Sequence, residues 1–318
     1  MMHENRFLIR LTTLIGVVLF LVGVMSTDVM AQSGVAAASA EVAGASPFPP
    51  LSQAEQQRLQ QLLLAWQTQS QSTKTLECEF RCWHYDMFAA PAGVHWKSSR
   101  GDVKYAAPDK GLFKVTSQFF FDGIKEAKPQ YVEKPGKYGE HWVCTGTELY
   151  EFDHEAKECK VQQLPPEMQG KNIIESPLPF VFNLDAQKIQ QRYWVREAPA
   201  PNQGIILIEA YPKQQQMRAQ YRLVQIALND QTFLPQALIL YAPNFDAKKA
   251  PKWDHYEFTK IKRNGIGQGM AMLMRNFIDV TPPPDYKVFK DRFQPAVPAQ
   301  PGTNGAPQQV AGETIQRR

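Results

Sequence analysis

Few residues of this chain have types and spacing that could do chemistry. Cys82 and His84 lie two positions apart on a segment that alternates like a strand, so both side chains point to one side and could reach one metal ion. No second pair follows at ligand spacing. We therefore expect a structural strand pair and no metal site.

A second polar group lies where a turn is expected and consists of Glu151, Asp153, His154 and Glu155. This setting favours a solvated hairpin tip over a pair of general acids. Nucleophile-elbow, zinc-protease and phosphate-loop motifs are absent, and the glycines at 265, 267 and 269 lack a strand–helix context, so they predict a turn. The sequence therefore indicates a protein that is not an enzyme and takes no cofactor.

Apolar and aromatic side chains give a stronger signal. They recur along the expected strands and in an unusually apolar segment, Pro177 to Phe182. Most belong in a core, and several are expected to line a cavity for a hydrophobic ligand. The expected lining residues are Phe80, Trp142, Tyr150, Phe152, Phe180, Phe182, Leu238, Leu240, Tyr256 and Phe258.

Composition sets the scale of the molecule. The chain has 318 residues, of which 43% are hydrophobic, which is enough for the core of one large domain. Its 35 Lys+Arg and 31 Asp+Glu residues give a net charge of +4, with no long run of one sign. Lys248, Lys249 and Lys252 predict a solvated loop. No nucleic-acid partner is expected.

The N-terminus predicts export. Arg6 and Arg10 precede an apolar stretch from Leu11 to Met25, and Val29-Met30-Ala31 supplies a cleavage site, so residues 1–31 resemble a signal peptide. The stretch is shorter than the ~20 residues that span a bilayer. We expect a periplasmic protein, and the alternative is an inner-membrane anchor formed by an uncleaved signal.

The rest of the chain divides by composition. Residues 32–50 are rich in Ala, Ser, Gly and Pro, which predicts a flexible linker. Residues 294–318 are rich in Pro and Gln and hold too few apolar residues to order themselves. One domain from 51 to 293 remains.

Four cysteines leave two alternatives open. They are Cys78, Cys82, Cys144 and Cys159. Two residues four apart on one strand are ~13 Å apart, so Cys78 and Cys82 cannot bridge each other. Either one of them pairs with Cys144 or Cys159, or all four are buried thiols.

Expected elements make the fold mostly β. Ser52 and Glu55 form a capping box ahead of an apolar stripe at Leu59, Leu62, Leu63 and Trp66, which predicts a helix. Alternation and turns then predict strands near 75–88, 110–121, 140–144, 149–153, 157–164, 204–211, 221–229, 236–241 and 253–263. Residues 165–192 interrupt them as an apolar plug, within which Asp185 would cap a short helix through Arg192. Short turns favour an antiparallel meander.

Four segments in order resemble the LolA family of periplasmic lipoprotein carriers and, more narrowly, the LolA-related secreted domain of planctomycete proteins. They are Gly101–Pro108 with Leu112–Lys114, Glu140–Asp153, Ser176–Phe182 and Asn276–Pro284. The resemblance covers most of residues 52–290. It implies an α+β, mostly β fold, in which a curled antiparallel sheet forms an incomplete β-barrel, and an N-terminal helix and a helical or loop plug cover its concave face.

The resemblance also implies a function. The expected ligand is a lipid or a lipoprotein acyl chain bound in a half-barrel cavity, with envelope proteins as further partners and transport to the outer membrane as the role. The carriers have an arginine before the first hairpin's proline, where this chain has Ala107, with Arg100 and Lys104 nearby as substitutes. The alternative is a scaffold or envelope sensor module with a filled barrel.

Overall fold

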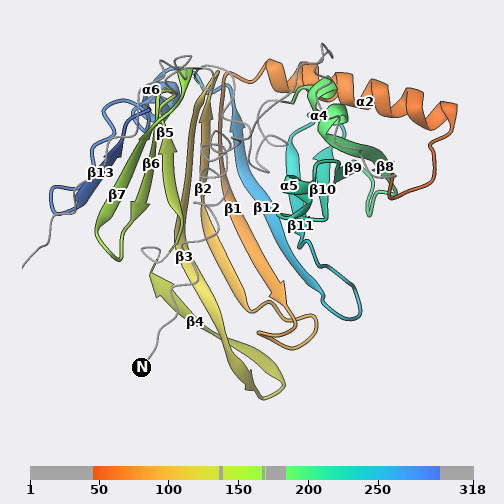
Figure 1. The fold of residues 1–318 in the computed structure, drawn as a ribbon, viewed down its shortest axis with the longest axis horizontal. Helices are drawn as coiled ribbons and strands as arrows, with labels where there is room; N and C mark the ends of the chain where they lie inside the picture. The colour runs from red at the N-terminus through yellow and green to blue at the C-terminus, as the bar shows by residue number, and fades with distance from the viewer. Residues whose placement is uncertain (1–45, 136–138, 167–168, 170–183, 294–318) are drawn as a thin grey trace, which may run out of the picture.

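The computed structural model describes residues 46–135, 139–166, 169 and 184–293. One sheet of thirteen strands dominates it (Figure 1). The strands are β1 (Thr75–Asp86), β2 (Lys97–Ala106), β3 (Lys110–Lys125), β4 (Lys128–Pro135), β5 (His141–Cys144), β6 (Glu148–Asp153), β7 (Glu158–Gln163), β8 (Tyr193–Ala198), β9 (Ile205–Pro212), β10 (Leu223–Asn229), β11 (Pro235–Tyr241), β12 (Lys252–Arg263) and β13 (Lys287–Asp291). The helices are α2 (Gln53–Gln71), α4 (Ala186–Arg192), α5 (Gln215–Arg218) and α6 (Gln268–Met274).

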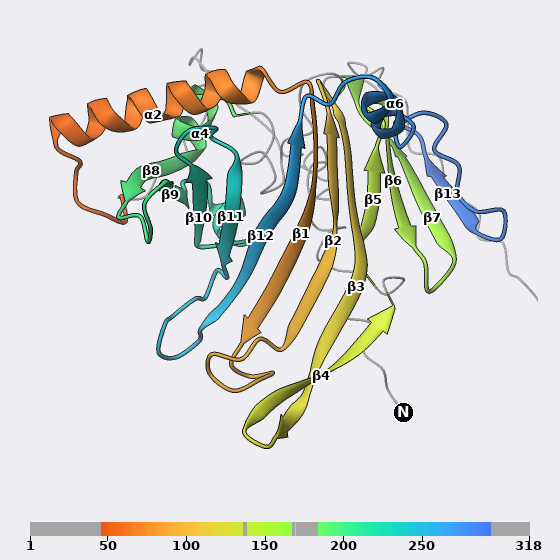
Figure 2. The same cartoon turned by 180° about the vertical axis from the view of Figure 1, so that it is seen from behind.

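The strands follow the order β13-β7-β6-β5-β3-β2-β1-β12-β11-β10-β9-β8, and β4 pairs with the distal half of β3. From β1 the chain runs outward to β7, continues at the opposite edge with β8, and returns to the centre, where β12 pairs with β1. The sheet curls without closing, with α2 across one end of the β8–β12 half and α6 beside β5–β7 (Figures 1 and 2). The predicted fold class is confirmed.

Two details differ from the sequence expectation. β13 pairs with β7 in parallel, so the sheet is not purely an antiparallel meander. The chain leaves β12 at the centre of the sheet and reaches this edge only after α6, a crossover that allows a parallel pair. The structure also contains β2, β4, β8 and β13, which alternation and turns did not predict, although the family resemblance implied a strand within Gly101–Pro108, and α6 begins within the glycine-rich stretch that predicted only a turn.

Helix α2 confirms its sequence signals. The Ser52 hydroxyl accepts from the Glu55 N–H, and the Glu55 carboxylate accepts from the Ser52 N–H, which completes the capping box. Leu59, Leu63 and Trp66 are the buried stripe. Asp185 likewise caps α4 by accepting from the Lys188 N–H. No helix of the described residues is both long enough and apolar enough to cross a membrane.

The sheet has two differently covered faces. The inner face carries the main core, in which side chains of α2 and α4 pack with those of β1, β2, β3 and β8–β12. The outer face carries a second core, in which Leu273 and Phe277, from α6 and the segment after it, pack with Ala106, Leu112 and Val143. The predicted plug, including Phe180 and Phe182, lies largely outside the described residues.

Candidate ligand-binding site

The inner face is apolar at the end nearest α2. Phe80 on β1 stacks on Phe113 of β3 at 4.6 Å between ring centroids, and Phe113 stacks on Trp142 of β5 at 6.0 Å. Tyr256 of β12 lies 6.0 Å from Phe80 and 6.4 Å from Phe258. Strand pairing explains the cluster, because Phe80 is directly opposite Phe258 and Phe113 directly opposite Trp142.

Of the expected lining residues, Phe180 and Phe182 lie outside the described residues, and the other eight fall into three groups. Phe80, Leu238 and Phe258 are buried inside the main core. Trp142, Leu240 and Tyr256 are partly buried at the edge of that core, where they keep solvent-accessible surface. Tyr150 and Phe152 pack against the α6 core on the outer face, so the structure does not bring them together with the others.

Toward the far ends of the same strands, the inner face becomes polar. Beyond Phe80, β1 places Cys82 and His84 on this face, and His84 Nδ1 lies 2.7 Å from Asp254 Oδ1 of β12. On the other side, His84 Nε2 lies 3.5 Å from the Ser99 hydroxyl of β2. The Cys82 sulfur is 4.0 Å from His84 Nδ1. The sequence pattern found Cys82 and His84 but missed Ser99 and Asp254, which only pairing brings together.

The hydrogen-bonded chain Asp254–His84–Ser99 has the residue types of a catalytic triad and could pass a proton. Acyl transfer also needs hydrogen-bond donors that stabilise an oxyanion. Ser99 lies within a strand and pairs with Cys82 on one side and Gln118 on the other, so its backbone is part of the sheet ladders. What this arrangement offers is a hydrogen-bonded network that can hold a polar ligand group. The described residues contain no group of three His, Cys, Asp or Glu side chains that could hold a metal ion.

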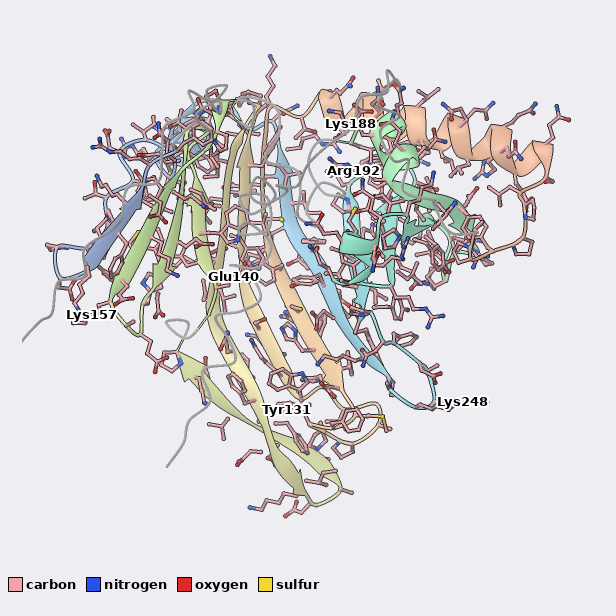
Figure 3. The ribbon with its side chains drawn as sticks, viewed as in Figure 1. Tyr131, Glu140, Lys157, Lys188, Arg192 and Lys248 are labelled. Carbon is pink, nitrogen blue, oxygen red and sulfur yellow. The ribbon has the colours of Figure 1, made fainter. Side chains whose placement is uncertain are left out.

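Further polar and charged side chains surround the Asp254–His84–Ser99 network. Lys97 is only 8% exposed, Ser99 4% and Gln118 2%, so this is a polar cluster largely withdrawn from water. Glu140, which precedes β5, accepts from Trp142 Nε1 at 3.0 Å, and Figure 3 labels it near the middle of the sheet. Desolvation raises the pKa of Glu140, while the Trp142 hydrogen bond and the charge of Lys97 oppose the rise.

The four cysteines are buried free thiols. Strands β2 and β3 separate β1 from β5, which puts Cys78 and Cys82 ~14 Å from Cys144 at ~4.8 Å per strand. Cys144 pairs with Leu149 on the inner face, whereas Cys159 pairs with Phe152 on the outer face. Burial raises the pKa of Cys78 to about 12 and that of Cys144 to about 11. The structure therefore contains four buried free thiols and no disulfide among these cysteines.

The polar residues expected at one hairpin tip, from Glu151 to Glu155, lie on two different faces of the sheet and in the turn. Asp153 accepts from the N–H groups of Glu155 and Ala156 in the turn, as a solvated tip requires. Glu151 pairs with Trp142 on the inner face. His154 belongs to an outer-face chain, in which His141 Nδ1 lies 2.7 Å from His154 Nε2 and His154 Nδ1 lies 2.7 Å from the Tyr286 hydroxyl.

The two residues that could substitute for an arginine at Ala107 point away from the inner face. Lys104 donates to Asn276, just after α6, and the Arg100 guanidinium lies over the Phe119 ring at 5.3 Å. Both residues have even numbers on β2, whose odd positions, such as Val103 and Tyr105, face the main core. They therefore act on the outer face.

No protein-family description matches the sequence, and no curated protein matches it. Solved structures with a similar arrangement include an uncharacterized conserved protein from Thermus thermophilus (TM-score 0.40, 9% identity, 73% of this chain and 99% of that one). They also include a LolA superfamily protein from Nitrosomonas europaea (TM-score 0.30, 11% identity, 65% of this chain and 96% of that one). A third is MucB in complex with MucA from Pseudomonas aeruginosa (TM-score 0.32, 11% identity, 64% of this chain and 57% of that one). Similarities this weak leave the function to be argued from the chain itself.

Proposed function

We propose that this protein is a non-enzymatic binder of a lipid or a lipoprotein acyl chain, which it holds on the inner face of the curled sheet. The observation that carries the proposal is that the apolar side chains of Trp142, Tyr256 and Leu240 are only partly buried at the edge of the main core, so apolar surface on the inner face stays accessible. Each methylene that such a surface removes from water contributes about 0.8 kcal/mol, so a long chain binds without any chemistry.

The proposed setting is the periplasm. Residues 1–31 would direct export, residues 51–293 would form the binding domain, and the segments 32–50 and 294–318 would flank it. Carriage of the acylated ligand toward the outer membrane is the proposed role. Sequencing the N-terminus of the protein isolated from the envelope tests the signal, because cleavage leaves Gln32 as the first residue and an uncleaved anchor leaves the original start.

Ligand binding is tested by extracting the purified full chain and identifying any lipid by mass spectrometry, and by displacing a fluorescent fatty-acid probe. We expect a co-purified acyl compound and displacement by long-chain ligands. Absence of both would contradict the proposal.

A second candidate is a scaffold or envelope sensor that binds proteins and holds no lipid. It is favoured by the near-complete burial of Phe80 (1% exposed), Leu238 (2%) and Phe258 (6%), which fill the α2 end of the inner face. This candidate predicts that acyl probes fail to bind and that envelope proteins co-purify with the chain.

A further inference from the structure

The polar end of the inner face has a defined lateral structure. Strand pairing sets Ser99 opposite Gln118 and Gln118 opposite Lys134, while Lys97 stands opposite Phe120. Paired residues share a face, so all of these side chains project on the inner side of the sheet. The row crosses β2, β3 and β4, and the β3–β4 hairpin continues beyond it, away from α2 (Figure 1).

Two ammonium groups converge on one ring in this row. Lys134 Nζ lies 4.6 Å from the centroid of Phe120, and Lys97 Nζ lies 5.7 Å from the same centroid. Ser99 and Gln118, both buried, supply a hydroxyl and an amide beside them. These are donor groups that recognise an anion.

The acids that face the same region are partly neutralised. Asp254 is held by His84 at 2.7 Å, and Asp86 is held by Lys252 at 2.7 Å. Glu140 and Glu151, which is opposite Trp142, are further acids on this face. Glu140 lies close enough to Lys97 for that charge to lower its pKa, although desolvation and the charge of Glu151 raise it. A ligand anion would therefore compete with Glu140 for Lys97.

We propose that this end of the inner face binds the anionic head of the ligand, a carboxylate or a phosphate, between Lys97 and Lys134, with the acyl chain directed along β3 toward Phe113 and Trp142. The inference rests on the proposed function, because it assigns the polar end of the same ligand. It names the ligand class as an anionic amphiphile.

The test compares palmitate, lysophosphatidic acid and methyl palmitate in displacing an uncharged fluorescent probe from the full chain. Wild type should bind at least one of the two anions about tenfold more tightly than the ester, and the better one identifies the head group. Lys97→Met and Lys134→Met should each reduce that preference while ester binding persists. Glu140→Gln, which removes the competing carboxylate, should increase it. Lys128→Met, at the exposed far end of the β3–β4 hairpin, is the matched control and should change nothing.

The outcomes separate the two proposals. If wild type binds the ester and both anions equally, or if the lysine variants keep the preference, the head-group site is wrong and acyl binding stands. If neither the ester nor the anions bind, both proposals fail. Unchanged ester affinity in Lys97→Met shows that the variant is folded, and Lys97→Arg should restore the preference.

Discussion

Trp142 and Tyr150 lie on neighbouring strands, yet their side chains occupy opposite faces of the sheet. Trp142 pairs with Glu151, so the residue before Glu151 must point the other way. At the scale of single residues, this alternation decides which aromatics can meet a ligand on the inner face and which support α6.

Glu209 provides a test of residue energetics. It is buried, accepts from Arg196 Nε at 2.7 Å, and receives further hydrogen bonds from Tyr211 and Gln225. Glu209→Ala leaves these donors without their acceptor and should lower the free energy of unfolding by about 2 kcal/mol. Glu197→Ala removes a more exposed pair with Arg58 and should cost no more than ~0.5 kcal/mol. Urea denaturation of both variants measures the difference, and equal losses would contradict it.

His141 predicts a pH dependence. Burial, the charge of Lys114 and His154 lower the pKa of His141 to about 3. An unfolded histidine has a pKa of ~6.5, so between these values the unfolded state binds more protons and the protein loses stability as the pH falls, by at most ~1.4 kcal/mol per pH unit for this group. His141→Asn should therefore lose less stability than wild type between pH 7 and pH 5 in urea denaturation. Identical pH profiles would show that His141 contributes nothing.

At the scale of elements, the β2–β3 pair depends on one glycine. The register shifts between Arg100 and Gly101, and a Cβ at Gly101 would lie 2.6 Å from Phe80 Cε1 and closer still to the Lys114 carbonyl oxygen. Gly101→Ala must push β3 or the Phe80 ring away and should destabilise the protein by about 2–3 kcal/mol. Gly123→Ala, with open space around it but a positive φ, should cost about 1 kcal/mol. A thermal melt ranks the two, and the reverse order would contradict the packing described.

Local signals predicted most elements but not all. The Ser52–Glu55 box and the Leu59, Leu63 stripe predicted α2, and the alternation after Thr75 predicted β1, because these patterns depend only on neighbours in sequence. β4 is exposed along almost its whole length and β13 along all of it, so neither shows the alternation of a half-buried strand. Their pairing with β3 and β7 is decided by the rest of the sheet.

The candidate site was harder to predict than the fold. The alternation of β1 predicted that Phe80 and Cys82 share a face of the sheet. It carries no information on which residues of the neighbouring strands lie on that same face. Trp142, Leu240 and Tyr256 pack against the inner-face core, while Tyr150 and Phe152, which were expected beside them, lie on the other side of the sheet. No sequence motif marks the polar residues of this face, because they come together only through the pairing of β12, β1, β2 and β3. They are Lys97, Ser99, Gln118 and Asp254.

At the scale of the whole molecule, the two faces of the sheet differ in what they offer a ligand. The inner face runs from an apolar end beside α2 to a polar end at Lys97 and Asp254, an order suited to an amphiphile lying along the strands. The outer face carries Trp83, which lies 5.5 Å from His255 and faces away from this gradient. Trp142 and Trp83 therefore report on opposite sides of one sheet.

Quenching of tryptophan fluorescence by a brominated fatty acid tests binding on the inner face most directly. We expect saturable quenching of the wild-type chain, reduced in Trp142→Phe and retained in Trp83→Phe, because bromine most strongly quenches the rings nearest the acyl chain. Quenching that disappears in Trp83→Phe but persists in Trp142→Phe, or no quenching at all, would contradict binding on the inner face.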